Sequence, residues 1–90
     1  MLHSMLMTVR IHEQRRMKES VDELFREYDN VDLIISELGP LGFFVRAEKP
    51  TLIVMENPSL ELYIQIDLMP NKELKGHEIL TFEEIEEAVR

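Results

Sequence analysis

Two different spacings of apolar residues mark the first third of the chain. Met5, Met7, Val9 and Ile11 stand at alternate positions, a period of two that predicts a β-strand with one apolar face. From about Glu13 to Tyr28 the period becomes that of an amphipathic helix. The apolar stripe of this predicted helix comprises Met17, Val21, Leu24, Phe25 and Tyr28.

The middle of the chain reads as a series of short strands. Asp29-Asn30 supplies turn chemistry, and the β-rich run from 31 to 38 ends at Gly39-Pro40. The next predicted strands span 43–48, 51–56 and 60–68, and a shorter one spans 74–80. Their connections are short and carry proline, which favours antiparallel neighbours.

A helix start is encoded near the C-terminus. Thr81 and Glu84 have the spacing of a capping box, with the threonine as N-cap and the glutamate three positions later. This motif predicts a helix that continues through Ile85, Ala88 and Val89.

The order of these elements defines a fold class. We expect an α+β domain with a largely antiparallel sheet of four to six strands, an N-terminal strand-helix unit and a short C-terminal helix. If the first two strands share the sheet, the helix between them should form a right-handed crossover. The 90 residues suit a single domain over 1–90, in which we expect residues 1–4 to be dispensable.

Several strands are apolar on both faces, which bears on assembly. Leu52, Ile53, Val54 and Met55 are consecutive, so both sides of that strand need cover. Two short helices cannot cover both faces of the sheet, so we expect a homodimer; the alternative is that the N-terminal segment folds over the second face. Adjacent Phe43 and Phe44 place one ring on each face of the sheet. One ring is expected in the core, and the other is either an interface anchor or part of a core that extends to both faces. The candidate interface residues are Phe43, Phe44, Ile53 and Met55.

The charge is strongly negative but unevenly distributed. Eighteen acidic and ten basic side chains give a net charge of −8, yet residues 1–18 carry +3 and the remainder −11. We therefore expect no direct nucleic-acid binding, and pairing with a basic protein or with a second copy instead. No stretch has the apolar length of a membrane span or the pattern of an export signal, so the sequence predicts a cytoplasmic protein without membrane contact.

Two charged clusters are candidate binding sites. Four cations near the start of the first predicted helix could bind an anion there, or could be solvated or paired with Glu19 and Asp22. The C-terminal glutamates could contact a basic partner, or could form a solvated helix face. The candidate anion-binding residues are Arg10, Arg15, Arg16 and Lys18, and the candidate acidic partner-binding residues are Glu83, Glu84, Glu86 and Glu87.

Motifs for catalysis, metal binding or a cofactor are missing from the sequence, so none of the three is expected. There is no cysteine, and no glycine-rich loop or nucleophile motif. Adjacent His77 and Glu78 diverge on any regular element and do not converge on one ion. The leading hypothesis is accordingly a small acidic interaction or regulatory protein, acting as a homodimer without catalysis.

Two alternatives belong to other classes of protein. The first is an inhibitor or antitoxin-like protein that blocks a basic nucleic-acid-binding surface, which requires Glu61, Asp67 and the C-terminal glutamates on one sheet face. The second is a small-ligand binding domain with a pocket near Phe44, Tyr63 and His77.

Overall fold

Three helices, one short 3-10 turn and four strands make up the part of the chain that the structure describes. The computed structural model describes the backbone of residues 2–89 and the side chains of residues 9–85. The order is α1 (Leu2–Glu27), α2 (Val31–Leu38), the 3-10 turn η1 (Gly39–Leu41), β1 (Phe44–Lys49), β2 (Leu52–Asn57), β3 (Leu62–Leu68), β4 (Leu74–Thr81) and α3 (Phe82–Val89).

The four strands form one antiparallel meander in the order β1-β2-β3-β4. Ile53 pairs with Ile66 and Met55 with Ile64, so the central strands present their apolar positions on the same face. β1 contains a bulge between Val45 and Ala47. The antiparallel sheet and the four predicted strands from 43 to 80 are thereby confirmed, with ends shifted by one or two residues.

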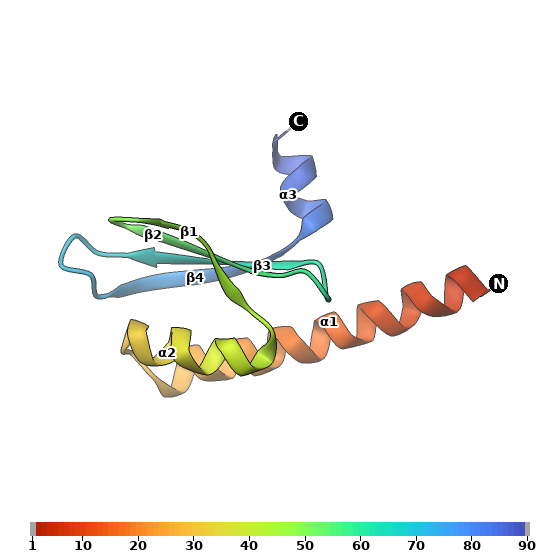
Figure 1. Cartoon of the computed structure of the whole chain (residues 1–90), viewed down its shortest axis with the longest axis horizontal. Helices are drawn as coiled ribbons and strands as arrows, with labels where there is room; N and C mark the ends of the chain where they lie inside the picture. Colours follow the sequence, from red (N-terminus) through yellow and green to blue (C-terminus); the bar gives the residue numbers. More distant parts are fainter. Residues whose placement is uncertain (1, 90) are drawn as a thin grey trace.

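The two longer helices cover one face of the sheet. Figure 1 shows α1 and α2 side by side beneath it, while α3 rises from the end of β4 on the other side. Val21 of α1 and Ile34 and Leu38 of α2 are fully buried against this face. The predicted stripe of α1 packs around them, because Met17, Leu24, Phe25 and Tyr28 all contact the core.

The predicted N-terminal strand is wrong, because residues 5–11 belong to the continuous helix α1. Glycine and proline first occur at 39 and 40, so no helix breaker separates these residues from the helix that follows. Methionine and leucine are also good helix formers. Val9 and Ile11 are exposed, which shows that their alternation does not face a core.

The predicted strand at 31–38 is also wrong, because these residues form α2. Val31, Ile34, Ile35 and Leu38 lie at i, i+3, i+4 and i+7, which is a helical stripe. The Asn30 side chain caps the helix by accepting a hydrogen bond from the Leu33 N–H at 3.0 Å. Without these two strands there is no strand-helix unit and no crossover connection.

The C-terminal helix begins where the capping box predicts. The Glu84 N–H donates to Thr81 Oγ1 at 3.1 Å, and the hydroxyl in turn donates to Glu84 Oε1 at 3.1 Å. Within residues 2–89, no helix is both long enough and apolar enough to pass through a membrane.

Candidate protein-interaction surface

The face of the sheet opposite α1 and α2 is the candidate functional site, and we call it the open face. The strand register places Phe44, Ala47 and Lys49 of β1 on it, opposite Glu56, Val54 and Leu52 of β2 respectively. Tyr63 of β3 and Leu80 of β4 continue the row that contains Phe44. The open face therefore mixes apolar side chains with charged ones, which are Lys49, Glu56, Asp67 and Glu78.

Helix α3 extends the open face at one end. Its first residue, Phe82, stacks on Tyr63 with ring centroids 4.6 Å apart. The Phe82 N–H also donates to the Glu61 carbonyl oxygen at 3.0 Å, which fixes the start of the helix beside β3. Figure 1 shows α3 standing at the edge of this face without lying across it.

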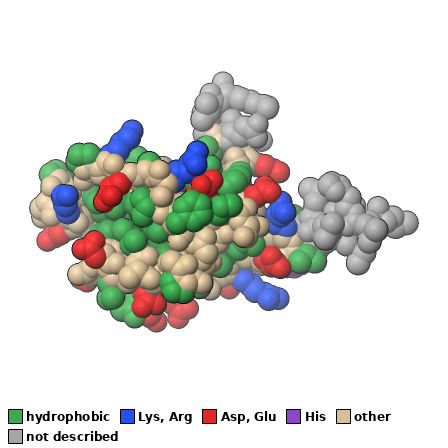
Figure 2. All heavy atoms as spheres, in the orientation of Figure 1, with side chains coloured by type: hydrophobic (Ala, Val, Ile, Leu, Met, Phe, Trp, Pro, Cys, Tyr) green, Lys and Arg blue, Asp and Glu red, His purple; other side chains and the backbone are tan. Residues whose placement is uncertain are grey.

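Apolar side chains on this part of the molecule are accessible to solvent. Phe44 is 51% exposed, and Leu52, Val54 and Tyr63 are half-buried. Figure 2 looks toward the edge of the sheet that β1 forms and shows hydrophobic side chains gathered along that edge, with the open face seen edge-on. A solvated sheet face is normally polar, so the accessible Phe44 and its apolar neighbours make this face the candidate contact surface.

The predicted interface residues separate into two groups. Phe43, Ile53 and Met55 are at most 4% exposed and form part of the core between the sheet and the helices. Phe44 alone of the four points to the open face. A partner reaching this sheet would instead meet Phe44 together with Leu52, Val54 and Tyr63, which lie at the neighbouring positions.

The predicted anion-binding cations do not lie at a helix start, because α1 begins at Leu2. Arg10 pairs with Glu61, and Lys18 Nζ lies 3.9 Å from Glu84 Oε1. Arg15 and Arg16 are exposed on the middle of the helix. The free backbone N–H groups expected for an anion site are therefore not next to these side chains.

The predicted acidic cluster is partly neutralised within the chain. Glu83 and Glu84 are exposed in the first turn of α3, and Glu84 faces Lys18; the side chains of Glu86 and Glu87 lie outside the described residues. Glu61 and Asp67 flank opposite ends of β3. Asp67 thus lies apart from Glu61, which is next to the start of α3, and the inhibitor hypothesis stays a prediction.

The predicted ligand pocket does not form, because its three residues lie on opposite faces of the sheet. Phe44 and Tyr63 belong to the open face, whereas His77 pairs with Ile66 on the helix side. His77 Nε2 lies 2.7 Å from Asp22 Oδ1, and the ring stacks on Phe25 at 3.9 Å. His77 therefore fastens β4 to α1. Among the described side chains no three potential ligands converge on a metal position.

One structurally important side chain escapes sequence reasoning. Asn57 is 2% exposed and is the buried polar side chain within the part of the chain that the structure describes. Its Nδ2 donates to the Leu41 carbonyl oxygen at 3.2 Å, and its Oδ1 accepts from the Leu60 N–H at 3.1 Å. The Asn57-Pro58 sequence indicates a turn, but nothing in it reveals that the side chain also holds the segment after α2.

Comparison with protein-family models, with curated proteins and with solved structures finds no match for this chain.

Proposed function

We propose that this protein is a small, acidic, non-enzymatic interaction protein that works as a homodimer through the open faces of two sheets. The observation that carries the proposal is the group of apolar side chains, Phe44, Leu52, Val54 and Tyr63, on a sheet face that neither α1 nor α2 covers. Leu52 and Val54 alternate with the buried Ile53 and Met55, so β2 presents large apolar side chains on both sides.

A second copy suits this face in chemistry. An isologous contact requires a patch that complements itself. Lys49 and Asp67 lie in the same cross-strand row, and Glu78 occupies the next row beside Gln65. Glu56 is a third carboxylate of the face, and Arg46 Nη1 lies 3.5 Å from its Oε2. With Lys49 against three carboxylates, a two-fold contact is favourable where Lys49 of each copy meets a carboxylate of the other.

The size of the face also fits a dimer. Four strands about 4.8 Å apart, each about six residues long at roughly 3.3 Å per residue, span roughly 19 by 20 Å. When two such faces meet, and the uneven surface of the side chains and Phe82 are included, the two copies together bury on the order of 1,000 Å² of accessible surface. This total is near the lower limit for a specific interface. We therefore expect a dimer that dissociates on dilution.

The sheet edge is a poorer route to association. β1 is an edge strand, but it carries a bulge at Arg46 and the charged side chains of Glu48 and Lys49. Bulges and edge charges are features that oppose strand-to-strand pairing between molecules. The face is thus a better supported contact than the β1 edge.

The native mass over a range of concentrations tests the proposal. We expect sedimentation velocity to give twice the chain mass at high concentration and a shift towards the monomer on dilution. Val54→Glu places a carboxylate in the centre of the face and should yield a folded monomer. Leu33→Glu makes a similar change at an exposed position of α2 and is the matched control, which should remain dimeric.

If Val54→Glu prevents folding, Phe44→Glu gives the same test at a more exposed position. A native mass equal to one chain at every concentration would contradict the proposal. A dimer that both variants leave intact, with circular dichroism showing normal folding, would place the contact elsewhere.

A further inference from the structure

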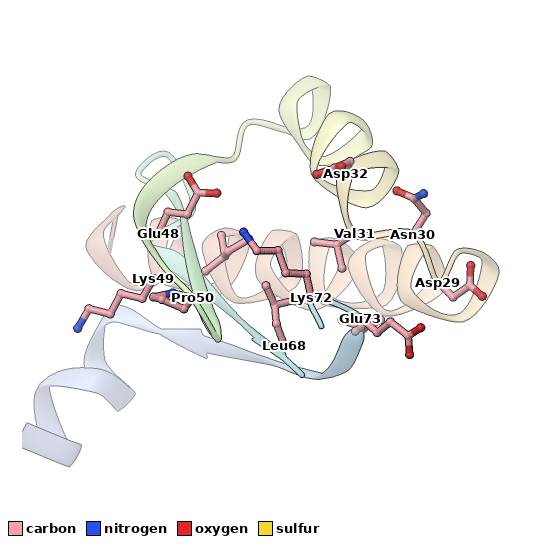
Figure 3. A pocket seen from close by; sticks show the side chains of 12 residues that line it. Asp29, Asn30, Val31, Asp32, Glu48, Lys49, Pro50, Leu68, Lys72 and Glu73 are labelled. Carbon is pink, nitrogen blue, oxygen red and sulfur yellow. The ribbon is translucent and has the colours of Figure 1, made fainter. Parts of the chain in front are cut away.

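A second surface lies on the helix side of the sheet, at the end where the hairpin turns meet the start of α2. Its floor is apolar and consists of Val31, Ile53, Leu68 and Leu74. Ile53 and Leu68 are buried core residues, while Val31 and Leu74 are half-buried. Three connections surround this floor, between α1 and α2, β1 and β2, and β3 and β4, and we call the concavity the hairpin groove (Figure 3).

Acidic side chains predominate around the hairpin groove. Asp29 and Asp32 contribute from the start of α2, Glu48 from β1 and Glu73 from the β3-β4 turn, against two lysines, Lys49 and Lys72. No three of these or other described acidic groups are close enough to hold a metal ion. Carboxylates that are spread around an apolar floor suit several cationic side chains on one segment better than a single ion.

The orientation of Lys72 indicates what the groove accepts. Figure 3 shows its side chain stretched into the groove, whereas Lys49 points away. Among the described residues, the Lys72 ammonium has no carboxylate within 4.0 Å. Lys72 thus occupies the groove as a long aliphatic chain with a cationic end, without being locked there by an ion pair.

We propose that the hairpin groove binds a basic, amphipathic segment of a partner protein, whose apolar side chains meet the floor while its lysine or arginine side chains meet the acidic rim. Lys72 occupies this groove in the free protein and moves aside on binding. The complementary charge supports this choice of partner, because the rim carries four acidic and two basic side chains on a protein of net charge −8.

The site is separate from the open face. Ile53 and Leu68 point to the helix side of the sheet, and Val54 and Asp67 beside them point to the other. The groove can therefore be tested on a monomeric variant such as Val54→Glu, so that failure of dimerisation and failure of groove binding are distinguished.

The test uses a synthetic helical peptide of lysine and leucine at amphipathic spacing, with a second peptide in which glutamate replaces lysine. We expect the lysine peptide to shift the backbone NMR signals of Val31, Glu48 and Leu74, and the glutamate peptide to leave them unchanged. Asp32→Lys combined with Glu48→Lys should weaken binding, by about two- to fivefold for each reversed charge. Glu83→Lys on α3 makes the same change outside the groove and should have no effect.

Lys72→Ala should change the affinity for the lysine peptide in the opposite direction to the charge reversals. Removing the side chain that occupies the groove should tighten binding of the lysine peptide by about two- to fivefold. Equal binding of the lysine and glutamate peptides would overturn the proposal. So would signal shifts confined to α3 or the open face, or a Lys72→Ala variant that binds the peptide no better than the unaltered chain.

Discussion

Replacing Asn57 tests how the segment after α2 is held against the sheet. The side chain donates to the Leu41 carbonyl oxygen and accepts from the Leu60 N–H, and it is almost fully buried. Asn57→Ala removes both hydrogen bonds and leaves two backbone groups without these partners. A buried group left without its partner costs about 1–3 kcal/mol, so we expect the free energy of unfolding to fall by about 2–4 kcal/mol.

Asn57→Asp separates the two hydrogen bonds. The remaining carboxylate oxygen still accepts from Leu60, but the oxygen that replaces the amide NH₂ opposes the Leu41 carbonyl. Burial disfavours the charged form, so the pKa of the new carboxyl should be higher in the folded than in the unfolded chain. The variant should therefore be less stable than Asn57→Ala at neutral pH and recover relative to it as the pH falls and the carboxyl is protonated.

Urea unfolding followed by circular dichroism measures both effects. Each variant is compared with the unaltered chain at neutral pH and near pH ~4.5, above the unfolded carboxyl pKa of about 3.9. A loss for Asn57→Ala below about 0.5 kcal/mol, which is typical of an exposed site, would refute the role assigned to the side chain. A gap between the two variants that does not narrow at low pH would refute the argument from charge burial.

Two further substitutions test contacts at the edges of the sheet. His77→Ala removes the stacking on Phe25 and the contact with Asp22, and should lower the free energy of unfolding by about 1–2 kcal/mol. A double-mutant cycle with Asp22→Ala should show a coupling energy of at least about 0.5 kcal/mol. Strictly additive effects of the two substitutions would show that His77 and Asp22 do not interact. Glu61 has φ of 54°, so Glu61→Gly should raise the midpoint of thermal unfolding by relieving up to about 1 kcal/mol of strain. A lower midpoint would show that the ion pair with Arg10 outweighs the strain.

The strands could be predicted because the chain marks their ends. Lys49-Pro50, Asn57-Pro58 and Pro70-Asn71 fall at the connections of the meander, where proline cannot continue a ladder. The first 38 residues lack such marks, so the type of element depended on short apolar patterns alone. At 31–38 the content of β-branched residues favours a strand. The chain nevertheless forms a helix there, because the helical stripe of apolar residues packs against the sheet.

The functional surfaces were harder to predict than the strands. Alternation shows that Leu52 and Val54 share one face and Ile53 and Met55 the other, but not which face the helices cover. That choice follows from where α2 packs, whereas the sequence pattern at 31–38 predicts a strand. The hairpin groove is assembled from three connections that are distant in sequence, so no local pattern could reveal it.

The end of α2 determines which of the adjacent phenylalanines is available to a partner. Gly42 adopts φ of 100°, a conformation that residues with a side chain rarely adopt, and thereby reverses the chain after η1. The Phe43 N–H then donates to the Leu38 carbonyl oxygen at 3.2 Å, which ties Phe43 to the helix layer and turns Phe44 outward. A shift of one residue here would exchange the two rings and bury the anchor on which the proposed dimer depends. The turn at Gly42 therefore links the helical layer to the function of the open face.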